Sequence, residues 1–113
     1  MKERDSRVYL KDILESIDAI EKYLANLSEF DFDQNLLVQD AVIRRFEIIG
    51  EAASNVSVEF RQQHPQIEWR LMSDMRNKLI HEYYGVSTFT IYNTAKSELP
   101  KLKENLLKIV SEK

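Results

Sequence analysis

The stretch DSRVYLKDILESIDAIEKYLANL, residues 5–27, decides the fold class of this chain. Its apolar side chains recur at alternating spacings of three and four residues, at Leu10, Ile13, Ile17, Ile20, Leu24 and Leu27. An α-helix turns once in ~3.6 residues, so this spacing lines up the apolar side chains along one side of a helix. Charged residues fill the positions between them. The stretch therefore predicts an amphipathic helix with Asp5 or Ser6 as its N-cap.

A second helix is predicted from Gln34 to Val58, with Asp33 as its N-cap. It carries two adjacent apolar stripes, which are Val38, Val42, Phe46, Ile49, Ala53 and Val56, and Leu37, Ala41, Ile48 and Ala52. A helix that is apolar over so wide an arc needs neighbours on two sides. Helix 5–27 could cover one side and a second subunit the other. Gly50 lies inside the pattern, where a glycine indicates a close approach between two helices.

The remaining sequence predicts two more helical segments. Pro65 breaks the chain after the second helix, and a third helix runs from about Ile67 to about Tyr83. Gly85 then suits a left-handed turn at its C-terminus. A last helix follows, capped by Ser87 or Thr88, in which Pro100 predicts a kink or a short break.

These patterns predict an all-α protein, an antiparallel bundle of four to five helices that forms one domain over residues 1–113. A chain of 113 residues builds a modest core, so burial of surface in a homodimer would stabilise it. The absence of cysteine excludes disulfides and thiolate zinc sites. We find no signal peptide and no apolar stretch long enough for a membrane span, and we expect a cytoplasmic protein.

The formal net charge of −3 argues against broad, sequence-blind binding to nucleic acid. Any contact with phosphate must therefore be local. The segment RNKLIHEYY, residues 76–84, is the richest in groups that do chemistry at neutral pH, with a guanidinium, an imidazole and two phenols. On a helix that turns 100° per residue, Arg76 and Tyr83 point about 20° apart, but Arg76 and His81 about 140° apart. Arg76 and His81 can therefore converge only if the helix unwinds at its end or if a second copy of the chain supplies one of them.

Metal-free cleavage of RNA needs a base for the ribose 2′-hydroxyl, an acid for the leaving 5′-oxygen and a cation for the charged phosphorane. His81 suits either proton role and Arg76 suits the phosphate, and a dimer would offer two of each. A structural role is the alternative. A histidine in the last turn can bond free carbonyl groups, and Arg76 can pair with Asp74 or Glu82.

The second predicted helix also carries charged residues whose role can be interpreted in two ways. Arg45 and Glu51 can form local ion pairs on a solvated face, or one of them can reach the region of His81 and support the site as a second shell. The sequence leaves both interpretations open.

The pattern Arg76-Asn77-x3-His81-x-Tyr83 resembles the Arg-x4-His-x-Tyr motif of the HepT toxins, which belong to the HEPN superfamily of small helical ribonucleases. The segment RFEIIGEA, residues 45–52, resembles the second-helix segment of that family. Trp69 upstream of the motif and Pro100 within the last helix also match, so the resemblance covers nearly the whole chain.

The resemblance implies the toxin of a two-component toxin–antitoxin module, a metal-independent endoribonuclease that acts as a homodimer. Arg76 would bind phosphate and stabilise the transition state, His81 would be the general acid/base and Asn77 a support. The antitoxin would be a minimal nucleotidyltransferase that transfers AMP from ATP to Tyr83, and the toxin itself would need no cofactor. Two alternatives remain open, a non-catalytic module that binds a nucleotide or docks on a nucleotidyltransferase, and a purely structural helical dimer.

Overall fold

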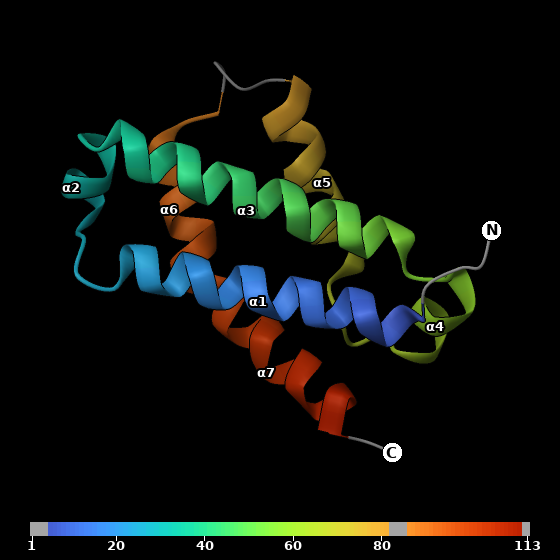
Figure 1. Ribbon diagram of the computed structural model, residues 1–113. Coiled ribbons are helices and arrows are strands. Elements are labelled where there is room, and N and C mark those ends of the chain that lie inside the picture. The colour runs from blue at the N-terminus through green and yellow to red at the C-terminus, as the bar shows by residue number, and fades with distance from the viewer. Residues whose placement is uncertain (1–4, 82–85, 112–113) are drawn as a thin grey trace.

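The computed structural model describes residues 5–81 and 86–111, apart from the side chains of residues 80 and 81. All regular structure in these residues is helical (Figure 1), in the order α1 (Ser6–Leu24), α2 (Glu29–Asp33), α3 (Leu36–Asn55), α4 (Val58–Gln63), α5 (Trp69–His81), α6 (Thr88–Ser97) and α7 (Leu99–Ser111). The predicted all-α class is confirmed. The described part exceeds the four to five expected helices because α2 and α4 are short extra helices and the last helix is split. None of these helices is long and apolar enough to cross a bilayer.

Helix α1 forms where the apolar spacing predicts it, but it ends at Leu24, three residues before the expected Leu27. Its stripe is buried from Leu10 to Leu24 and contributes to one continuous core. Asp5 is the N-cap, and its Oδ1 accepts a hydrogen bond from the backbone N–H of Arg7 at 2.8 Å. Satisfying a free N–H in this way is typical of Asp at a helix start.

The start of α3 differs from the sequence prediction. Asp33 does not cap it, because Ser28 and Asp31 form a capping box that folds residues 29–33 into α2. Asn35 is the N-cap of α3 instead, and its Oδ1 accepts from the N–H of Val38 at 3.1 Å. The carboxylate of Asp33 bonds to the hydroxyl of Thr88, which ties α2 to the first turn of α6. At the other end α3 stops at residue 55, three residues earlier than expected.

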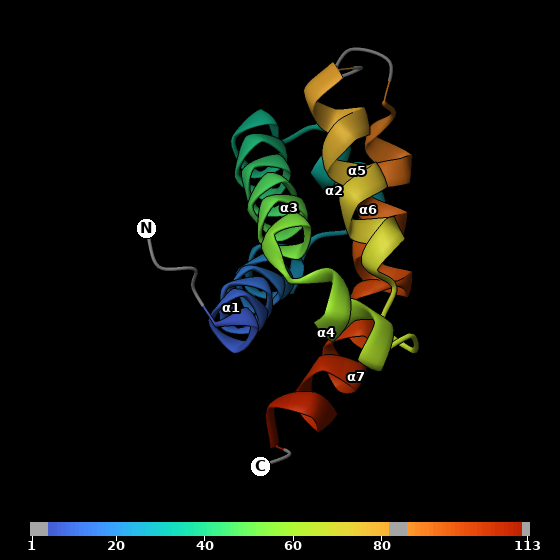
Figure 2. The ribbon, with the colours of Figure 1, turned by 90° about the vertical axis from the view of Figure 1, so that its right-hand side faces the viewer.

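Helix α3 lies between α1 on one side and α5 on the other, as Figures 1 and 2 both show. The neighbour on its second side is therefore α5 of the same chain, where the apolar pattern alone also allowed a second subunit. The two neighbours leave an outer face of α3 uncovered. Leu37 is 80% exposed on this face, and Ala41 and Ile48 are half-buried.

The break predicted at Pro100 is confirmed, because α6 ends at Ser97 and α7 begins at Leu99. Helix α7 then packs under α1. Lys103 of α7 donates from Nζ to Glu21 Oε1 at 2.8 Å and to Asp18 Oδ1 at 2.9 Å. The hydrogen bond to Glu21 and then that to Asp18 raise the pKa of Lys103 to about 12.

The raised pKa of Lys103 predicts a stability difference at high pH. The charged lysine stabilises the fold fully below its unfolded pKa of ~10.4, and this contribution is lost as the pH rises through about 12. We expect Lys103→Met to lower the free energy of unfolding by up to ~1 kcal/mol at pH 8 and by much less near pH 12, measured in urea. Lys101→Met is the matched control on the same helix. A loss of equal size at both pH values would contradict the prediction.

Candidate active site

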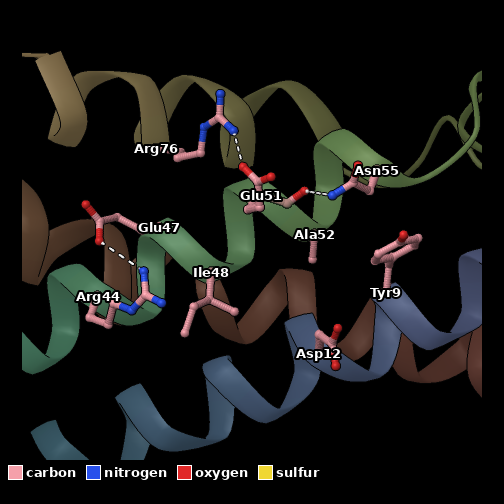
Figure 3. A pocket seen from close by; sticks show the side chains of 9 residues that line it. All are labelled: Tyr9, Asp12, Arg44, Glu47, Ile48, Glu51, Ala52, Asn55 and Arg76. Atoms are coloured by element: carbon pink, nitrogen blue, oxygen red, sulfur yellow. Dashed lines mark hydrogen bonds and ion pairs between the residues drawn. The ribbon is translucent and has the colours of Figure 1, made fainter. Parts of the chain in front are cut away.

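Arg76 lies in the middle of α5, and its guanidinium is held from two sides. Nη1 donates to Glu51 Oε2 of α3 at 2.6 Å, as Figure 3 shows. Nε and Nη2 both donate to Asn77 Oδ1, at 3.3 and 3.0 Å. The side chain of Arg76 is 25% exposed, whereas that of Glu51 is 66% exposed. The guanidinium is thus fixed in direction while it remains open to solvent.

The stem of Arg76 packs directly on Gly50 of α3. A Cβ atom added at Gly50 would collide with Arg76 Cβ and would lie 2.9 Å from both Arg76 Cγ and the backbone oxygen of Met72. The close helix approach predicted at Gly50 is confirmed, and its partner is the residue that carries the guanidinium. The contact between α3 and α5 therefore sets the position of Arg76.

Gly50→Ala is expected to destabilise the protein by about 1–3 kcal/mol, because the added methyl group meets a Cβ atom and a backbone oxygen that cannot rotate away. At an open helical position the same change would stabilise by ~1 kcal/mol, so the sign of the effect reports the contact. Unfolding in urea measures it. Ser54→Ala, one turn further along α3, is the control. It removes only the hydrogen bond from the Ser54 hydroxyl to the Gly50 backbone oxygen at 2.9 Å and should change stability much less. An increase in stability for Gly50→Ala would contradict the packing described.

A groove of about 370 Å³ opens beside this contact, between α1, α3 and α5 (Figure 3). Its walls are formed by Tyr9, Asp12, Arg44, Glu47, Ile48, Glu51, Ala52, Asn55 and Arg76. Figure 3 shows Arg76 reaching from α5 to Glu51, with Tyr9 and Asp12 on α1 across the groove. Carboxylates outnumber guanidinium groups in these walls, so the groove favours anions only at its arginines.

Two internal contacts order the polar residues of the groove. Arg44 Nη1 lies 3.7 Å from Glu47 Oε1, and Asn55 Nδ2 donates to the backbone oxygen of Glu51 at 3.0 Å. Glu51 lies between Arg44 and Asn55 along α3, inside the part of this helix that lines the groove. Of the two supporting residues that the sequence suggested, the structure brings Glu51 to Arg76, whereas Arg45 is half-buried on α3 and is not among the residues that line the groove.

The other predicted site residues follow Arg76 along α5. Asn77 is exposed and bonds the guanidinium, and His81 is the last residue of the helix, with its side chain outside the description. Tyr83 lies outside the described residues. Since α5 stays helical through His81, it does not unwind between the two motif residues, whose backbone positions are about 140° apart around the helix axis. Asp74, an alternative partner for Arg76, lies 3.7 Å from Arg70 instead.

Five polar lining residues were not predicted as site residues, namely Tyr9, Asp12, Arg44, Glu47 and Asn55. Arg44 could have been found, because it lies two helical turns before Glu51 and so shares its face of α3. Asn55 lies one turn after Glu51 and carries the same signal. Tyr9 carried no such signal, since its place in the groove depends on how α1 and α3 are aligned.

Comparison with known families gives one match that covers most of the chain. The model of the family described as "Ribonuclease HepT-like" matches residues 13–109, which include the guanidinium site on α5 and the α3 segment that holds it. The chain belongs to the HepT-like ribonuclease family. The family to which the sequence showed a resemblance is thereby confirmed.

Several relatives support this membership. A protein of Thermococcus cleftensis named "Probable ribonuclease HepT" is 42% identical over 106 residues, which are 94% of this chain and 96% of the relative. A "Putative RNase" of Methanocaldococcus jannaschii is 38% identical over 112 residues, which cover 99% and 93% of the two chains. No solved structure matches this HepT-like chain.

A further relative of this HepT-like chain is longer. It comes from Methanocaldococcus jannaschii, is named "Gamma-glutamylcyclotransferase and putative RNase", and is 46% identical over 109 residues. The match covers 96% of this chain, which spans about half, 49%, of that relative's length.

Proposed function

We propose that this chain is the toxin of a HepT-type toxin–antitoxin module, and that it is a metal-independent endoribonuclease acting as a homodimer. The observation that supports the proposal most strongly is the fixed guanidinium of Arg76. The motif residue that should bind phosphate rests on Gly50, is held by Glu51 and Asn77, and lies at the edge of an open groove. Preorganised cations of this kind stabilise charge that develops in a transition state.

In the proposed reaction Arg76 binds the scissile phosphate. A guanidinium carries five N–H groups, and the contacts with described residues use three of them. The others can donate to phosphate oxygens and stabilise the phosphorane. His81 acts as general acid/base. The 2′-oxygen loses its proton and forms a bond to phosphorus, the bond from phosphorus to the 5′-oxygen breaks, and that oxygen takes up a proton, which leaves a 2′,3′-cyclic phosphate.

A dimer supplies the residues that one straight helix cannot bring together. Because α5 turns Arg76 and His81 about 140° apart, we place each complete site between the Arg76 of one subunit and the His81 of its partner. The uncovered face of α3, with Leu37, Ala41 and Ile48, supports this arrangement. It is apolar, it is exposed at Leu37, and through Ile48 it continues into the groove beside Arg76.

Cleavage of a labelled RNA by the purified protein in EDTA tests the ribonuclease proposal. We expect fragments that end in 2′,3′-cyclic phosphate, no cleavage when the 2′-hydroxyls are methylated, and a loss of about 10²–10⁴-fold with His81→Ala. Cleavage that needs added metal, or that is unchanged by His81→Ala, would refute the proposed chemistry.

Regulation by AMP transfer to Tyr83 is the second element of the proposal. Adenylyl groups on this phenol would add negative charge and bulk near the motif cation and would compete with RNA phosphate. Incubation with ATP and the minimal nucleotidyltransferase proposed as its antitoxin, followed by mass spectrometry, should find added AMP on the native chain. The label should be absent from Tyr83→Phe, and a label that persists would place the modification on another residue.

A non-catalytic role is the second candidate, and one observation favours it. The carboxylate of Glu51 already neutralises Arg76 at 2.6 Å, and the chain as a whole is acidic. A module that binds a nucleotide or docks on a nucleotidyltransferase would fit these charges. Tight binding of ATP or AMP that depends on Arg76, together with no cleavage of RNA, would favour this role over the enzyme.

A further inference from the structure

A second cavity lies on the opposite flank of α5 from the groove. It has a volume of about 550 Å³ and opens between α5 and α6. Asp74, Asn77 and Lys78 of α5 and the hydroxyl residues Thr90 and Thr94 of α6 form its rim. The Asp74 carboxylate lies 3.7 Å from Arg70 Nε, so Lys78 is the cation of this rim and forms no ion pair with the described residues. Asn77 contacts both sites. It lines this cavity, and its Oδ1 accepts a hydrogen bond from the guanidinium of Arg76, which lines the groove.

The outer surface of α5 thus carries three successive polar residues, 76–78, between the groove and the second cavity. Each residue of a helix is rotated by about 100° from the one before it, so Arg76 and Lys78 point to opposite flanks with Asn77 between them. Asn77 and Lys78 are both exposed. Arg76 therefore lies at the edge of the groove and Lys78 at the edge of the second cavity, and the amide of Asn77 lies between them on the surface of α5.

The lining of the second cavity suits the face of a nucleobase. Its floor is apolar, formed by Met75, which is 6% exposed, and by the half-buried Leu71. The polar rim is ordered, because the hydroxyl groups of Thr90 and Ser87 are hydrogen-bonded at 2.9 Å. Ligand sites of small molecules commonly combine an apolar floor, a few polar groups and a volume of ~300–1,000 Å³.

We propose that this cavity is a second nucleotide subsite, and that a single RNA strand crosses α5 over Asn77. Arg76 binds the scissile phosphate on one flank, and Lys78 binds another phosphate of the same strand on the other flank. The two cations lie about one helix width apart, ~10–12 Å across a ridge, so the substrate must be a flexible single strand whose bases can enter a cavity. A rigid duplex cannot follow this path. The inference rests on the proposed ribonuclease function.

Equilibrium binding of a fluorescein-labelled single-stranded RNA with methylated 2′-hydroxyls tests the subsite, because this probe cannot be cleaved. We expect Lys78→Ala to weaken binding several-fold and to reduce the slope of log K against log salt by about 0.7, the effect of one single-strand phosphate contact. Lys101→Ala removes an exposed lysine of α7 that lines neither the groove nor this cavity, so it is the matched control and should bind like the native chain.

A second variant separates charge from shape. Thr94→Trp fills the cavity from its α6 rim and should weaken binding while the salt slope stays as in the native chain, with thermal unfolding as the check of the fold. Affinity and salt slope for Lys78→Ala equal to those of Lys101→Ala would overturn the subsite, as would a native chain that does not bind the probe. Failure of the ribonuclease proposal is distinguished by cleavage of unmethylated RNA, a separate readout.

Discussion

We expect Arg76→Ala to lower kcat for the proposed RNA cleavage by about 10²–10³-fold, the loss that follows when one preorganised donor to a transition-state anion is removed. The structure gives the reason. The guanidinium is fixed by Glu51 at 2.6 Å and by Asn77, so little reorganisation is needed when charge develops on the phosphorane. Arg76→Lys should recover only a small part of the rate, because an ammonium group cannot donate to both partners and to phosphate in one plane. Single-turnover cleavage measures the rate.

Two observations control this prediction. Arg70→Ala removes an arginine from the same helix that is 93% exposed and lies at a 3.7 Å ion-pair distance from Asp74, so its rate should be native. The fold of Arg76→Ala should be retained, since the carboxylate that it leaves unpaired, Glu51, is 66% exposed and stays solvated. A rate within tenfold of the native one, in a folded Arg76→Ala, would remove Arg76 from the proposed chemistry.

If each site is shared between two subunits as proposed, dimers that pair an Arg76→Ala subunit with a His81→Ala subunit should regain about half of the native activity, although neither variant should be active alone. Each complete site in the proposed dimer takes Arg76 from one subunit and His81 from the other. A mixed dimer therefore holds one intact site and one site that lacks both groups. The reason lies in α5, which remains helical through His81 and turns the two residues apart.

Coexpression with two different affinity tags isolates the mixed dimers for the cleavage assay. A mixed dimer in which both substitutions are on the same subunit is the matched control and should be inactive, because each of its sites lacks one group. Activity in this control with none in the first mixture would show that each site takes both residues from one subunit. That result would overturn the composite arrangement.

Much of the fold was predictable because it follows from local patterns. The apolar spacing of Leu10 to Leu24 gives α1, and Pro100 gives the break between α6 and α7. Boundaries were harder, since several side chains compete to cap the same turn. Ser28 and Asn35 prevailed over Asp33, and no sequence pattern ranks such competitors.

The site was predictable in its composition but not in its geometry. The sequence indicated a cation at Arg76 and a close approach at Gly50, yet nothing in it shows that the two are one contact. That contact and the ion pair to Glu51 depend on how α3 and α5 are aligned, which many buried side chains decide together. Local spacing therefore finds the residues, whereas packing decides which of them meet.

The packing of the Arg76 side chain against Gly50 links the candidate active site to the packed interior of the protein. A reactive group on a loop can move without a change in the packing of the helices. This guanidinium, in contrast, moves whenever the distance between α3 and α5 increases. A substitution that enlarges Met72, which is buried and whose backbone oxygen lies against Gly50, would therefore be expected to shift it. Efforts to make the protein more heat-resistant by refilling its interior should accordingly be screened for turnover at every step.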